Sequence, residues 1–215
     1  MKNQSISLQT IKLERANSIT HGLGLLFGLI SIPFLISAAI ASKEPSAIVG
    51  ASAFGFGFLL VYTCSTLYHS FHQPKVKRVL HILDHISIYF MIAGSYTPFV
   101  LTYLYNTTGI TLLSILWGLT IIGSFFKLFF TGRFEKLSVA LYLIMGWMIV
   151  FIARPVVANL PMDCILMILA GGLSYTIGVI FYRWEKSPYH HAIWHLFVLG
   201  GSICHYIAVW KVVAI

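Results

Sequence analysis

Residues 109–131 read GITLLSILWGLTIIGSFFKLFFT, an apolar run that holds a single charged side chain, Lys127. A run of about 20 largely apolar residues is long enough to cross the hydrocarbon core of a bilayer as an α-helix. Strands of a closed membrane barrel would instead alternate polar and apolar residues, which this run does not do. The stretch therefore predicts a transmembrane helix.

The rest of the chain has the same character. Of its 215 residues 58% are hydrophobic and 9% are charged, with a mean hydropathy of +0.86, whereas soluble domains carry about 25% charged residues. A soluble fold of this length could not bury so much apolar surface. We expect an all-α integral membrane protein, one domain over residues 1–215. Glycines within the apolar runs, such as Gly57 and Gly171, predict close helix packing. The expected spans cover residues 18–42, 46–70, 80–104, 109–131, 136–154, 162–183 and 190–211.

The fifth of these spans is the least well defined, because Arg154 and Pro155 truncate its apolar run. The three cysteines lie inside apolar runs and indicate small buried side chains rather than a disulfide framework or a CxxC metal site. The first residues are polar, so no cleavable secretory signal peptide is expected.

Basic residues predict how the chain is oriented. The formal charge of +8 does not indicate nucleic-acid binding, because the basic residues punctuate apolar runs rather than forming one polar patch. One set of alternating segments carries Lys2, Lys12, Arg15, Lys75, Lys77, Arg78, Arg133, Lys136, Arg183 and Lys186, with Lys127 in the last turns of the span that precedes one of them. The other set carries only Lys43, Arg154 and Lys211. The positive-inside rule then places the N-terminus in the cytoplasm and the C-terminus outside, in a multi-pass protein of the inner (plasma) membrane.

A polar constellation is expected at the cytoplasmic side. Asp84 is the only acidic residue clearly within an apolar span, and an ionisable group there is costly and suggests function. Ser65 and His69 lie four residues apart on one face of the second span, and His191 and His195 have the same spacing at the start of the seventh. Span order alone brings all five residues to similar depth.

The chemistry of this set indicates a metal site. Three neutral imidazoles with one open position are typical of catalytic zinc, and an i, i+4 histidine pair is a natural clamp. Asp84 could hold a metal-bound water and act as a general base. Ser65 could orient His69 or donate to an oxyanion.

Several alternatives remain open on pattern alone. A lone membrane histidine more often bonds a neighbouring helix, and Asp84 could simply pair with Arg78 or His81. His81 and His85 are also spaced i, i+4 and flank Asp84, so they form a rival clamp. His190 and His72 lie nearby in sequence, whereas His205 lies roughly 15 Å beyond His195 along the helix, too deep to join.

A second polar line starts the first span. Glu14, Asn17 and His21 are spaced i, i+3, i+7 and so form one helical stripe that runs into the bilayer. The favoured interpretation is a stripe that packs on or caps neighbouring helices. The functional alternative is that these residues, together with His81, surround the metal ligands or gate the pocket.

These motifs, taken in order and spacing, resemble those of the bacterial hemolysin III proteins, within the superfamily of progestin and adiponectin receptors and alkaline ceramidases. The resemblance covers all seven spans. Its anchors are Glu14-x2-Asn17-x3-His21-Gly22, Ser65-x3-His69, His81-x2-Asp84-His85-x3-Tyr89, Ala93-Gly94-Ser95-Tyr96-Thr97-Pro98-Phe99 and His191-x3-His195.

The resemblance implies a seven-helix fold with zinc held on the cytoplasmic side by His69, His191 and His195. It implies that Asp84 contacts the zinc through water, with Ser65 close by, and it sets aside the rival His81 and His85 pair. It also implies hydrolysis of lipid amides such as ceramides, while the hemolysin name implies a pore-forming cytolysin.

Three functions follow as hypotheses. The first is a zinc-dependent intramembrane hydrolase whose partner is a membrane lipid that enters laterally between the helices. The second is a receptor-like or regulatory membrane protein in which the zinc is structural. The third, a cytolysin or channel, is disfavoured because the few charged residues form one cluster and no ring that lines a path.

Overall fold

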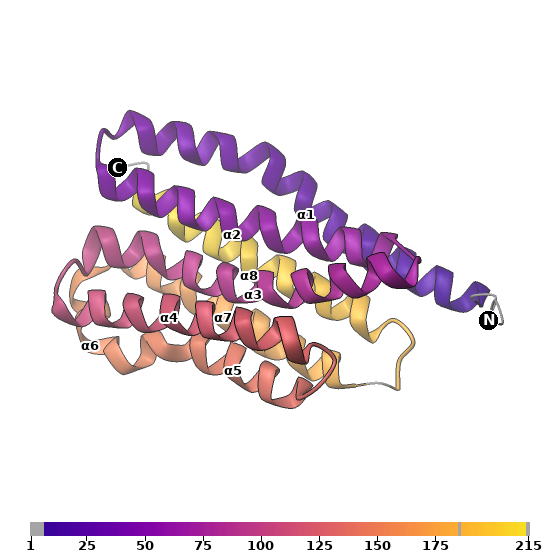
Figure 1. Ribbon diagram of the computed structural model, residues 1–215. Helices are drawn as coiled ribbons and strands as arrows, with labels where there is room; N and C mark the ends of the chain where they lie inside the picture. Colours follow the sequence, from indigo (N-terminus) through magenta and orange to yellow (C-terminus); the bar gives the residue numbers. More distant parts are fainter. Residues whose placement is uncertain (1–6, 185, 214–215) are drawn as a thin grey trace.

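The computed structural model describes residues 7–184 and 186–213 of the chain, and these form a bundle of helices (Figure 1). The helices are α1 (Leu8–Ala41), α2 (Pro45–Ser70), α3 (Pro74–Tyr103), α4 (Thr107–Phe130), α5 (Glu135–Trp147), α6 (Ala153–Asn159), α7 (Met162–Arg183) and α8 (His190–Val213), with a 3₁₀ turn over Met148–Ile152. Within these described residues, seven helical segments are long and apolar enough to cross a membrane. The predicted all-α, seven-span membrane fold is confirmed.

Two helices begin well before the apolar runs that predicted them. α1 starts at Leu8 rather than near residue 18, because the Ser7 hydroxyl caps it by accepting from the Thr10 amide at 3.1 Å. α3 starts at Pro74 rather than near residue 80, since proline is favoured in the first turn of a helix. Glu14 and Lys77 lie in these extensions, before the apolar runs of their helices begin. Lys2 and the polar start of the chain lie outside the described residues.

The fifth span differs from its predicted end at residue 154. The helical segment continues from Glu135 to Asn159 as α5, the 3₁₀ turn and α6. Arg154 and Pro155 do not end the span, because Pro155 lies in the first turn of α6, where its missing N–H leaves no internal hydrogen bond unmade. The 3₁₀ turn over Met148–Ile152 connects α5 to α6, so the departure from regular α-helix is confined to these residues.

The most extensive helix contacts join α2 to α3, α7 to α8 and α1 to α2. α8 contacts α1, α2, α3 and α7 (Figure 1). Between α2 and α3, a Cβ on Gly57 would lie 2.7 Å from the Phe90 carbonyl oxygen, so only glycine permits this backbone approach. The predicted role of the glycines in close packing is confirmed at this interface.

The predicted site residues, among them His69, Asp84 and His191, lie at one end of the bundle. We call it the site end, and it comprises the starts of α1, α3, α5 and α8 and the ends of α2, α4 and α7. The start of α1 and the end of α8 lie at opposite ends of the bundle, as an odd number of spans requires (Figure 1). Large apolar side chains such as Phe34, Ile122 and Phe129 are exposed along the flanks, where lipid would cover them.

Candidate metal centre

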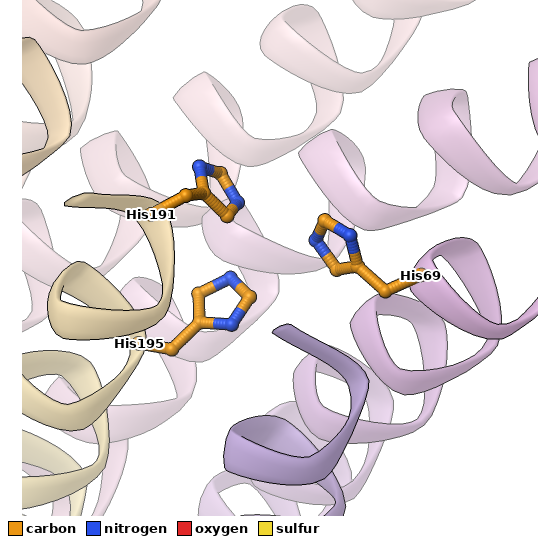
Figure 2. Close-up of side chains that lie close together, drawn as sticks. All are labelled: His69, His191 and His195. Atoms are coloured by element: carbon orange, nitrogen blue, oxygen red, sulfur yellow. The ribbon is translucent and has the colours of Figure 1, made fainter. Parts of the chain in front are cut away.

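Three histidines meet at the site end. His69 lies in the last turn of α2, and His191 and His195 lie in the first two turns of α8. One potential ligand atom from each lies within 4.8 Å of the others. Figure 2 shows the His69 ring pointing across from its helix towards the other two. His69 and His195 are buried and His191 is half-buried, so the group is largely withdrawn from water.

A carboxylate fixes the ring of His69. Its Nδ1 lies 2.7 Å from Oε2 of Glu14 on α1, and a carboxylate can only accept, so Nδ1 carries the proton. Lys77 holds Glu14 in turn, donating from Nζ to Oε1 at 2.9 Å and to the Tyr68 carbonyl at 3.1 Å. The buried Nε2 of His69 has no hydrogen-bond partner among the described residues, and it is the atom left for a metal.

The ring of His195 is fixed in the same manner by the backbone of α1. Its Nδ1 lies 3.1 Å from both the Asn17 carbonyl oxygen and the Thr20 hydroxyl oxygen. The carbonyl can only accept, so Nδ1 again carries the proton and Nε2 is the remaining ligand atom. His21 stacks on this ring, with centroids 3.5 Å apart and planes 23° apart.

These arrangements fit a metal ion. Neutral imidazoles that donate Nδ1–H to a carboxylate or a carbonyl present a basic Nε2, which is how metal-binding histidines are commonly oriented. The three histidines therefore could hold a metal ion through three nitrogen atoms.

Asp84 and Ser65 lie beside this group. The Ser65 hydroxyl on α2 interacts with the Asp84 carboxylate on α3, and both side chains line one cavity. Within the described part of the chain, the close ligand set contains only the three histidines and leaves Asp84 outside it. No ion pair joins Asp84 to Arg78 or His81 in residues 7–184 and 186–213.

The rival histidines face other partners. His81 stacks on Tyr68, with centroids 5.0 Å apart. His85 directs Nδ1 towards Oε2 of Glu135 at 3.7 Å, and Nζ of the buried Lys127 lies 3.7 Å from the other oxygen of that carboxylate. The His81 and His85 rings touch each other edge to face, but neither belongs to the three-histidine group.

The remaining histidines lie apart from the centre. His190 precedes His191, with ring centroids 6.2 Å apart. His72 follows the end of α2. His205 lies ten residues beyond His195, deep in the bundle.

Sequence reasoning missed two residues of the site. Thr20 was overlooked although it lies three residues after Asn17, on the same face of α1, so helical spacing could have found it. Lys77 was interpreted only as an orientation signal, because no sequence pattern shows that its amine reaches Glu14 across two helices.

A cavity of about 680 Å³ extends from these residues into the bundle. At the site end it is lined by Ser65, Asp84, His191 and His195, among others. Further in, its walls are largely apolar, with Met91, Ile92, Phe99, Ile168 and Val198 among them, and His205 also lines it.

Comparison with known proteins agrees with this architecture. A family model described as haemolysin-III related matches residues 9–206. Hemolysin-3 of Bacillus cereus is 50% identical over 197 residues, covering 90% of this chain and 89% of that protein. The hemolysin-3 homolog of Bacillus subtilis (strain 168) is 46% identical over 200 residues, covering 93% and 94%.

A more distant relative is the human monocyte to macrophage differentiation factor, which is 27% identical over 206 residues, covering 91% of this chain and 82% of that protein. The seven apolar helices, together with the bacterial relatives, identify a multi-pass cell-membrane protein. With the family model matching nearly the whole chain, this protein belongs to the haemolysin III-related family.

Proposed function

We propose that the protein is a zinc-dependent hydrolase that cleaves a lipid amide, such as a ceramide-like substrate, within the membrane. The observation that carries the proposal is the convergence of three imidazoles, two of which, His191 and His195, line the head of a largely apolar cavity together with a carboxylate and a hydroxyl. An all-nitrogen set of three histidines that leaves one position open is typical of catalytic zinc.

The cavity supports a lipid as the substrate. Its volume of about 680 Å³ lies within the range of about 300–1,000 Å³ usual for ligand pockets. An acyl chain in the cavity would contact the apolar side chains of Met91, Ile92 and Phe99. The amide group of the same molecule would lie beside Asp84. A polar substrate would make no favourable apolar contacts with these side chains.

The residues divide the reaction between them. His69, His191 and His195 would hold the zinc, which when bound would polarise the amide carbonyl as a Lewis acid and lower the pKa of water. Asp84 accepts a proton from the attacking water as the water oxygen bonds to the carbonyl carbon. Asp84 then passes that proton to the amide nitrogen while the carbon–nitrogen bond breaks, so the products are a carboxylic acid and an amine. Ser65 positions Asp84, because its hydroxyl donates to the carboxylate that takes up the proton.

The test is direct assay of the purified, zinc-loaded protein. A panel of ceramide-like amides and the matching esters is incubated in mixed micelles, and released fatty acid is measured by mass spectrometry. We expect amide cleavage that is removed by chelation and restored by zinc. Protein that is folded and zinc-loaded but cleaves none of the panel would contradict the proposal.

A further inference from the structure

His205 is a buried polar group that the proposed reaction does not use. It is 9% exposed, and neither of its ring nitrogens has a hydrogen-bond partner among the described residues. An imidazole left unpaired in an apolar interior is costly, so such a group calls for a partner supplied from elsewhere. Because His205 lines the cavity, a bound ligand can supply that partner.

The surroundings of His205 hold its ring in place. A Cβ on Gly171 of α7 would collide with the ring and lie 2.6 Å from Nε2, so this close approach requires glycine. The Tyr175 ring is 5.6 Å from the His205 ring, centroid to centroid, and also lines the cavity. Tyr175 is itself held, because its hydroxyl lies 2.9 Å from Ser202 Oγ, which also accepts from Tyr62 at 2.9 Å.

The position of His205 along the cavity sets the kind of ligand. His191, His195, Val198 and His205 line the cavity along one face of α8. At 1.5 Å per residue, His205 lies roughly 15 Å from His195. The wall between these two polar points is largely apolar. A matching ligand has a polar head at the metal end, then a hydrocarbon segment, then one more hydrogen-bonding group.

We propose that His205, with the Tyr175 ring packed beside it, forms a subsite whose imidazole recognises a hydroxyl group part-way along the apolar chain of the bound lipid. A neutral imidazole offers one donor and one acceptor, and a hydroxyl offers the same pair in return. An unsubstituted chain leaves both nitrogens unpaired. This inference rests on the proposed function for its assignment of the cavity to a lipid chain.

The test is a binding series with fatty acids, which needs no turnover. Stearic acid and hydroxystearic acids substituted at successive chain positions are titrated against a fluorescent fatty acid bound to the purified protein in nanodiscs. We expect affinity to peak at one mid-chain isomer, on the order of tenfold above stearic acid, since one hydrogen bond contributes about that factor.

Two variants and a control assign the peak. His205→Leu should remove the peak while binding stearic acid at least as well as the wild type. His205→Gln, which restores a donor and an acceptor, should retain part of the preference. Ser174→Ala is the control, because its hydroxyl donates to the Phe197 carbonyl between the same two helices without lining the cavity.

Three outcomes overturn the subsite. They are equal affinity for all the hydroxystearic acid isomers (a flat series), an affinity peak that survives in His205→Leu, and no binding of any fatty acid. Cleavage of an unhydroxylated lipid amide is measured in parallel. Intact cleavage with a flat series contradicts the subsite alone. A mid-chain peak in a protein that cleaves no amide supports the subsite and contradicts the proposed hydrolysis.

Discussion

At the residue scale, Asp84 separates a catalytic metal from a structural one. Asp84→Asn keeps the shape of the side chain but cannot take up a proton, and loss of a general base typically lowers turnover by a factor of about 10²–10⁴. Three imidazoles suffice to hold the ion, so the variant should keep its zinc. Lipid-amide cleavage and metal content are measured on the same preparation. Loss of metal would make Asp84 a direct ligand and favour the receptor-like function, whereas wild-type turnover would contradict the proposed role of Asp84.

Glu14 offers a second test at this scale, because its carboxylate accepts the hydrogen bond from the Nδ1–H group of His69. Removing a carboxylate that orients a metal-bound histidine typically weakens metal binding by about 10–100-fold. We expect Glu14→Ala to show a loss of that size in titrations against a competing chelator, and Glu14→Gln a smaller one. Glu44→Gln, an exposed carboxylate at the far end of α2, is the matched control. Equal zinc affinity in Glu14→Ala and the control would refute the positioning role.

The residues of the site were predictable only in part. Spacing along single helices placed His191 with His195 and Ser65 with His69, because the i, i+4 repeat fixes a shared face. The same repeat fits His81 and His85 equally well, and only the rotation of α3 against its neighbours turns these rings towards Tyr68 and Glu135. That rotation is set by packing between helices, which a single sequence does not record.

At the element scale, the α2–α3 interface holds Ser65 against Asp84. A side chain at Gly57 would meet the Phe90 carbonyl oxygen at 2.7 Å, and backbone cannot move aside cheaply. We expect Gly57→Ala to destabilise the protein by about 1–3 kcal/mol, the usual cost of overpacking. Gly118→Ala is the control, since nothing lies within 4 Å of its added Cβ. Unfolding in detergent measures both, and equal stability of the two variants would contradict this account of the interface.

The helices themselves were largely predictable, because runs of about 20 apolar residues have no other stable form in a membrane. Their ends were not, since hydropathy marks where the apolar zone stops rather than where the helix stops. α1 begins about three turns before its apolar run, and those turns carry Glu14 to His69. The fifth span passes Pro155 because proline in a first turn breaks no hydrogen bond.

At the scale of the whole molecule, the basic residues predict which way the bundle lies. Apart from Lys43, Arg154 and Lys211, the lysines and arginines lie in the segments assigned to the cytoplasm or, in the case of Lys127, in the last turn of a span that leads to one. We expect the site end to face the cytoplasm. An alkaline phosphatase reporter, which is active only outside the cytoplasm, should be active at the C-terminus and inactive at the N-terminus. Activity of a C-terminal reporter only in the cytoplasm would refute seven spans in this orientation.

The bundle brings His69, His191 and His195 together, and we propose that they bind zinc; metal analysis of the purified protein is the experiment that decides this. We expect about one zinc per chain, as a site with one set of three imidazoles requires. We also expect that His191→Ala/His195→Ala loses most of that zinc, while the matched double variant His81→Ala/His85→Ala retains it. Undiminished zinc in His191→Ala/His195→Ala, or its loss from His81→Ala/His85→Ala alone, would contradict the proposal.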